Sequence, residues 1–197
     1  MTAMLVTNTL IAAVALTMLI GLRHRQTAPA HPTISALMLG YLAVVAQGLV
    51  EWLLPDVKDA LHLSRNLVNF VAVSFIGFGV LSLTLTNPWA KAIWGKGLLG
   101  LMACFELFRR FDWALQWQTI LWVITTGALL LVAWKSRGMA KAIPLCGLLA
   151  GLELLSTPEV GLLHNLWGLT SFLLLSTVAA VHLLLVRQAP AIEPDAL

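Results

Sequence analysis

The sequence predicts an all-α fold, a bundle of seven transmembrane helices with the N-terminus outside the cell and the C-terminus in the cytoplasm. Of its 197 residues, 59% are hydrophobic and only 11% are charged, whereas soluble domains carry about 25% charged residues. The hydrophobic residues form long runs that prolines and charged clusters separate. A helical bilayer crossing takes about 20 residues, so the chain is long enough for about seven crossings.

The first two helices are predicted from apolar runs at Met4–Leu22 and Thr33–Leu54. Arg23 and Arg25 come after the first run, whereas a cleaved signal peptide carries its positive charges before the apolar run. We therefore expect an uncleaved helix, followed by a short loop with two prolines. Pro55 should end the second helix, because proline lacks the backbone donor that a helix interior needs.

The third and fourth helices are predicted at Arg65–Thr86 and Trp89–Phe108, with residues 55–64 as a polar loop before them. The fourth helix has only a short uncharged apolar part. Its Lys91 and Lys96 would have to extend their aliphatic stems to reach the membrane interface. A re-entrant or interfacial segment is the alternative, and it would leave six transmembrane helices.

Three further runs complete the predicted bundle, at Trp113–Trp134, Ala140–Leu155 and Gly161–Val186. The short middle run contains two glycines four residues apart, a spacing that lets transmembrane helices approach closely. Residues 188–197 are expected to form a short cytoplasmic tail. Residues 1–187 therefore make a single transmembrane domain.

The orientation is predicted from the distribution of charge. Lysine and arginine are enriched in the cytoplasmic loops of membrane proteins. With seven helices and the N-terminus outside, eight of the twelve basic residues fall on the cytoplasmic side and seven of the nine acidic residues fall outside. This bias explains the net charge of +3 without a nucleic-acid partner. The predicted location is a bacterial-type inner membrane, with the lipid bilayer as the main partner.

Polar side chains gather at the predicted outer ends of the helices. The second, fourth and sixth helices each end with one glutamate, and the third and seventh begin with asparagine or histidine. Carboxylates near hydrocarbon usually turn inward and find a partner, so we expect a shared polar site. The candidate binding residues are Glu51, Asn66, Glu106, Arg109, Arg110, Glu153, His164 and Asn165.

Simpler interpretations exist for the same residues. Arg110 follows Glu106 by four residues, a spacing at which helical side chains meet, so the two can form an ion pair that closes a helical hairpin. Glu51 and Glu153 can reach the outer headgroup layer. His164 can form a hydrogen bond at the membrane interface.

No motif predicts a cofactor. Cys104 and Cys146 lie in separate apolar runs without a CxxC pattern, so both are expected to be buried thiols. His62 and His164 could join the glutamates around a metal ion, but no HxxxH or HExxH spacing supports this arrangement. Metal binding is therefore left open.

The stretch from His164 to Trp167 resembles the corresponding stretch of the alkaline ceramidase and adiponectin-receptor superfamily. Those membrane hydrolases share a serine, an aspartate and three zinc-binding histidines, so the resemblance implies a zinc-dependent hydrolase. Gly168 stands where a second histidine of this helix would be required. The ligand set is incomplete, and the chain is not assigned to that superfamily.

Three functions follow from these patterns. The favoured one is the binding or translocation of a small solute or ion through a polar site open to the outer side. The first alternative is a structural or assembly subunit, with other membrane subunits or further copies of the chain as partners. The second is a membrane-embedded metal-dependent hydrolase, although no catalytic motif indicates an enzyme.

Overall fold

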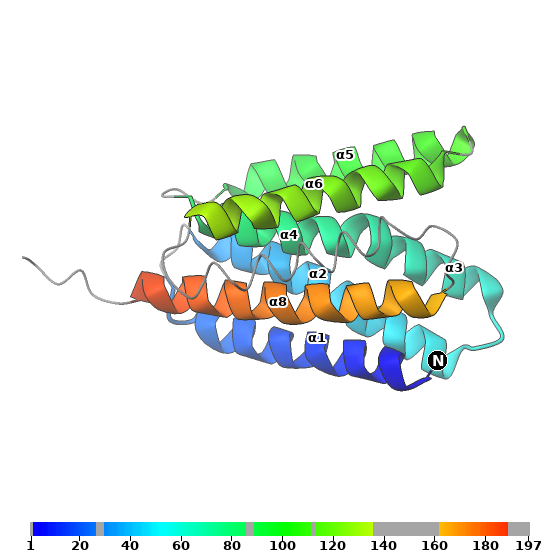
Figure 1. Ribbon diagram of the computed structural model, residues 1–197, viewed down its shortest axis with the longest axis horizontal. Coiled ribbons are helices and arrows are strands. Elements are labelled where there is room, and N and C mark those ends of the chain that lie inside the picture. The colour runs from blue at the N-terminus through cyan, green and yellow to red at the C-terminus, as the bar shows by residue number, and fades with distance from the viewer. Residues whose placement is uncertain (1, 27–29, 86–88, 112, 136–161, 189–197) are drawn as a thin grey trace, which may run out of the picture.

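The computed structural model describes residues 2–26, 30–85, 89–111, 113–135 and 162–188, and these ranges are helical with short connections and no strand (Figure 1). The predicted all-α class is confirmed. The elements are α1 (Thr2–Arg23), α2 (His31–Leu53), α3 (Lys58–Leu67), the π-helix η2 (Val68–Ala72), α4 (Val73–Leu83), α5 (Lys91–Arg110), α6 (Ala114–Lys135) and α8 (Leu162–Gln188). The helices lie along the long axis of the molecule.

Five of the predicted helices occur nearly where the sequence places them. α1, α2, α5, α6 and α8 each begin and end within two residues of a predicted segment. Long apolar runs between prolines and charges therefore located these helices well. The predicted helix at Ala140–Leu155, with its pair of glycines, lies outside the residues that the structure describes.

The prediction of a polar loop at residues 55–64 is wrong. The helix begins at Lys58, and α3, η2 and α4 follow one another without a break to Leu83. No glycine or proline occurs from Lys58 to Leu67, and Asp59 lies in the first turn, where the helix dipole favours a negative charge. Only residues 54–57 connect α2 to α3.

A single π-helical segment, η2, interrupts this long helix. The backbone N–H of Val73 donates to the carbonyl of Val68, five residues earlier. The hydroxyl of Ser74 donates to the carbonyl of Phe70 at 3.1 Å. This bond gives a backbone carbonyl within η2 a hydrogen-bond donor. π-Helical segments are rare in proteins, and those that occur are often found at functional sites.

Three helices in the described ranges are long and apolar enough to cross a membrane: Leu5–Arg23, His31–Leu53 and Lys58–Leu83. This is fewer than the seven that the sequence predicts. One reason is α5, which carries two lysines, two arginines and a glutamate among its 20 residues. In α8, the apolar stretch of described side chains is the shorter range Leu169–Leu185.

The main core joins α1, α2, α4 and α8. α2 packs on α1 and α4, and α8 packs on α1 and α4. Tyr41, Ile76 and Leu173 are fully buried at this centre. Gly40 of α2 allows the close approach to α4, because a Cβ atom there would lie 2.7 Å from Ile76 Cγ1 and 3.1 Å from the carbonyl oxygen of Ala72. Small residues allow transmembrane helices to pack this closely.

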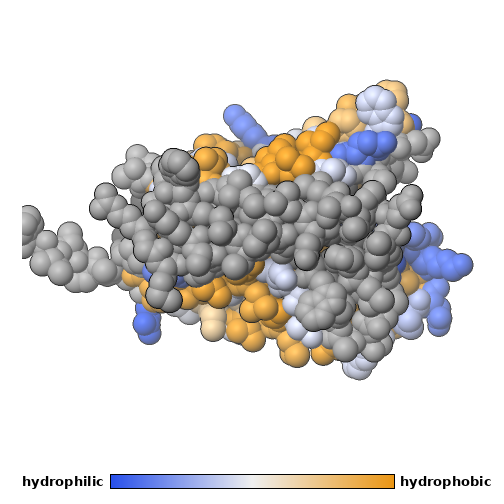
Figure 2. All heavy atoms as spheres, in the orientation of Figure 1, coloured by the Kyte–Doolittle hydropathy of each residue, from blue (hydrophilic) through white to orange (hydrophobic). Residues whose placement is uncertain are grey.

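The outer faces of the bundle are apolar. Exposed valine, leucine, isoleucine and methionine side chains occur on α1, α2, α5, α6 and α8. On the face drawn in Figure 2, hydrophobic side chains lie between the two ends, and hydrophilic ones gather toward those ends. This distribution is compatible with a protein surrounded by lipid.

Candidate functional site

Seven of the eight residues predicted to form the polar site lie toward one end of the bundle. The ends of α2 and α5 and the beginnings of α3, α6 and α8 lie toward this end (Figure 1). It therefore holds Glu51, Asn66, Glu106 and Arg110. Arg109 lies in α5, and His164 and Asn165 lie in the first turn of α8, but their side chains are outside the described part. Glu153 is also outside it.

Among the described residues, Glu51 is the best-enclosed acidic residue at this end. Its side chain is 11% exposed, and its Oε1 atom accepts hydrogen bonds from Arg65 Nε at 3.0 Å and from Gln47 Nε2 at 3.0 Å. Gln47 lies one turn before Glu51 on α2, whereas Arg65 belongs to α3 and its side chain reaches Glu51 from there. The short α2–α3 connection places these three side chains together.

Both donors reach the same oxygen of Glu51. Within the described residues, the other oxygen, Oε2, accepts no hydrogen bond, and Arg65 uses only Nε of its guanidinium group. Arg65 is 33% exposed and remains accessible from outside. The pair therefore offers a free carboxylate oxygen beside free guanidinium donors, while Asn66 lies half-buried next to Arg65.

The second ion pair is more open. Arg110 Nε donates to Glu106 Oε1 at 3.1 Å, with exposed side-chain fractions of 73% and 42%. The predicted pairing at a spacing of four residues is confirmed. Exposed pairs of this kind add little to stability, so we expect this pair in the last turns of α5 to contribute little to folding.

Aromatic rings stabilise the turn between α5 and α6. The Phe108 ring stacks on the Trp117 ring with centroids 4.8 Å apart and on Trp113 at 6.5 Å. The backbone N–H of Trp113 donates to the carbonyl of Phe108 at 2.9 Å. The predicted hairpin turn is therefore present, and stacked rings connect its two helices.

A pair of rings also ties α5 to the π-helix. Phe105 and Phe70 lie with centroids 4.5 Å apart. Phe105 directly precedes Glu106, and Phe70 lies five residues after Arg65. Both ion pairs are thus positioned by elements that contact η2.

The bundle interior contains hydrogen bonds that the sequence interpretation missed. Thr170 Oγ1 donates to Asn8 Oδ1 at 2.6 Å, joining α8 to α1. Thr177 Oγ1 donates to the hydroxyl of Tyr41 at 2.9 Å, joining α8 to α2. Thr33 and Ser82 share a bond at 3.0 Å between α2 and α4. The only signal in the sequence was the presence of these polar residues within apolar runs.

No metal centre is found in the described ranges, where histidine, cysteine, aspartate and glutamate nowhere form a group of three. His62 of α3 is exposed. Cys104 is a free thiol that is only half-buried, whereas the sequence predicted a buried one. Cys146, the second predicted filler, lies outside the described residues.

The two ion pairs should differ in their effect on stability. Replacing Arg65 by glutamine is expected to lower the free energy of unfolding by about 2 kcal/mol, because it leaves a largely buried carboxylate without its cation. Arg110→Gln is the matched control, with an expected change within about 0.5 kcal/mol. Denaturant unfolding in one detergent measures both, and equal losses would contradict the distinction drawn from exposure.

Comparison of the chain with protein-family models, with curated proteins and with solved structures finds no match.

Proposed function

We propose that the chain is a multi-pass protein of a bacterial-type inner membrane that binds or translocates a small solute or ion at its extracytoplasmic end. In this proposal seven helices cross the membrane, with the N-terminus outside and the C-terminus in the cytoplasm. The three long apolar helices support insertion. α5, α6 and α8, with 20, 22 and 27 residues, are also long enough to span, and residues 140–155 would supply the seventh crossing.

The observation that carries the proposal is that only one of the two carboxylate oxygens of Glu51 accepts hydrogen bonds from the described residues. Two donors hold its Oε1 in place, while Oε2 accepts nothing from the described residues. A carboxylate at the edge of a membrane span is costly, and such residues usually mark a binding site or a pathway. A purely structural pair would be expected to use both oxygens and more of the guanidinium donors.

The chemistry of the pair limits the ligand. Glu51 Oε2 suits a proton, a cation or a hydrogen-bond donor, and the free guanidinium donors of Arg65 suit an anionic or carbonyl group. A small zwitterion would satisfy both groups at once. Glu106, Glu153 and His164 would provide further charge or hydrogen bonds at the same end.

Replacing Glu51 by glutamine is expected to abolish ligand binding and proton coupling while expression stays normal. The amide keeps the size of the side chain but removes its charge and its capacity for protonation. Thermal stability of the purified protein with sodium, potassium, glycine or betaine measures binding. Proteoliposomes that contain a pH-sensitive dye measure proton coupling, and Glu153→Gln is expected to behave in the same way.

Asp59→Asn is the matched control, because Asp59 is an exposed carboxylate of α3 near the same end. It should keep every response of the unmodified protein. If Glu51→Gln and Glu153→Gln both keep the same responses, the shared polar site is not the functional site, and the proposal fails.

A further inference from the structure

A cavity of about 460 Å³ lies at the end of the bundle opposite Glu51, between α1, α2, α4 and α5. Its volume is in the range of small-molecule sites. Positive and polar side chains form the rim, and apolar side chains form the wall. The lining residues include Arg23, His31, Ser35, Lys91, Phe75 and Trp94.

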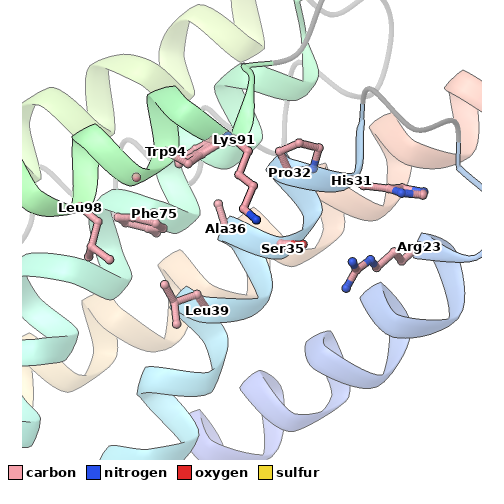
Figure 3. Close-up of a pocket in the computed structure, with 11 residues that line it drawn as sticks. Arg23, His31, Pro32, Ser35, Ala36, Leu39, Phe75, Lys91, Trp94 and Leu98 are labelled. Atoms are coloured by element: carbon pink, nitrogen blue, oxygen red, sulfur yellow. The ribbon is translucent and has the colours of Figure 1, made fainter.

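The rim is cationic. Figure 3 shows Arg23 at the end of α1 and Lys91 at the beginning of α5, with their charged groups directed toward the first turns of α2 from opposite sides. Neither side chain has an ion-pair partner in the described ranges, and no acidic residue lines the cavity. His31 is fixed beside them by a contact of 3.0 Å between its Nε2 and the carbonyl of Gln26. A second cavity of about 370 Å³ shares Arg23 and His31.

Two helix N-termini add to the positive charge at the rim of the cavity. They belong to α2, which begins at His31, and to α5, which begins at Lys91. No side chain caps the start of α2, and Pro32 in its first turn has no backbone N–H. Helix N-termini favour anions through their free N–H groups and the helix dipole. The mouth of the cavity therefore combines side-chain cations with the positive ends of two helix dipoles.

The wall below the rim is apolar. Phe75 and Trp94, with ring centroids 5.4 Å apart, are buried at 4% and 9% exposure. Leu39 and Leu98 lie eight and seven residues beyond the starts of α2 and α5, so they are roughly 10–12 Å deeper along the helices. Leu39 is 41% exposed, and the cavity is therefore open sideways along an apolar face.

Trp94 contributes an unused donor. Its indole nitrogen is buried and has no hydrogen-bond partner in the described part of the chain. Buried tryptophan N–H groups usually have an acceptor.

We propose that this cavity binds an anionic phospholipid of the cytoplasmic leaflet, with its phosphate between Arg23 and Lys91 and an acyl chain along Leu39 and Leu98. A free phosphate would satisfy the rim but leave the apolar wall unused, and a neutral lipid would leave the cations unpaired. Basic pockets between transmembrane helices on the cytoplasmic side recognise anionic headgroups. The inference rests on the proposed membrane insertion and orientation but not on the Glu51 site.

Native mass spectrometry of the full chain in detergent tests this site, with phosphatidylglycerol and phosphatidylcholine of identical acyl chains as probes. Phosphatidylglycerol should bind preferentially, and Arg23→Gln with Lys91→Gln should weaken it about 30-fold, roughly fivefold for each cation. Lys96→Gln is the charge control, since Lys96 is exposed on α5 but does not line the cavity. It should leave binding unchanged.

Filling the cavity provides a second test. A side chain at Gly95, which lines the cavity, or at Gly100, which does not, would meet no atom within 4 Å at its Cβ. Gly95→Leu should abolish preferential binding, and Gly100→Leu should preserve it with the same thermal stability.

Three outcomes would overturn the proposal. The first is equal binding of both lipids, and the second is binding that survives both the double charge variant and Gly95→Leu. The third is complete displacement by millimolar glycerol 3-phosphate, which would identify a soluble phosphate site. Carbonate extraction of membranes tests insertion separately, and ligand responses of the Glu51 variants test the proposed function separately.

Discussion

Gly40→Leu is expected to lower the free energy of unfolding by about 3 kcal/mol. Even the first carbon of the new side chain would lie 2.7 Å from Ile76 and 3.1 Å from the backbone oxygen of Ala72. Ile76 can rotate, but the Ala72 carbonyl belongs to η2 and can move only with its helix. α2 would have to separate from α4, so the loss should appear as a shifted transition in denaturant unfolding followed by circular dichroism.

Gly21→Leu is the matched control for this substitution. Gly21 lies near the end of α1, and a Cβ atom there would meet nothing within 4 Å. The variant has the same gain in volume and the same change in backbone freedom, and it should unfold like the unmodified protein or slightly later. Equal destabilisation of both variants would show that helix packing at Gly40 is not the cause.

Tyr41→Ala should have the largest effect in the core, a loss of about 3–5 kcal/mol, the range typical of removing a buried aromatic side chain. The Tyr41 ring is fully buried between α1, α2, α4 and α8. Its removal would leave a cavity where these helices meet. Denaturant unfolding in detergent measures the loss.

Tyr41→Phe separates the ring from the hydroxyl. Only the bonds to Ser176 at 3.3 Å and Thr177 at 2.9 Å are lost, and each of these hydroxyls can then donate its one proton to a carbonyl of its own helix. We expect a loss of about 0.6 kcal/mol, typical of interhelical hydrogen bonds in membranes. If Tyr41→Phe is as damaging as Tyr41→Ala, the hydroxyl network is the main source of stability at this position, contrary to our assignment to the ring.

The helices were predictable because the pattern that locates them, an apolar run bounded by prolines or charges, lies within one continuous stretch of sequence. Apolar runs and the residues that interrupt them placed α1, α2, α5, α6 and α8 within two residues. Residues 58–64 were misjudged because polarity was taken to mean a loop. An exposed helical extension beyond an apolar span is polar too, and the absence of glycine and proline there was the better indicator.

The candidate site was predictable only in part, because pairing across helices depends on helix rotation. The partner of Glu106 was identified from its spacing within one helix. The partner of Glu51 was not, since Arg65 lies 14 residues away across a connection that had been predicted to be longer. The cavity beside Arg23 was missed for a similar reason: Arg23 and Lys91 are far apart in sequence, and each fits the excess of positive charge on the side predicted to be cytoplasmic.

The π-helix η2 sets the direction in which the side chains of α3 point around the helix axis. One extra residue in a helical turn rotates everything before it by about 100° and shifts it by about 1.5 Å relative to a regular helix. Without η2, Arg65 would face more than a quarter of a turn away from its present direction, and Glu51 would lose its partner. The contact between Glu51 and Arg65 therefore depends on backbone hydrogen bonding deeper in the bundle, so a one-residue deletion in η2 would act on the site from a distance.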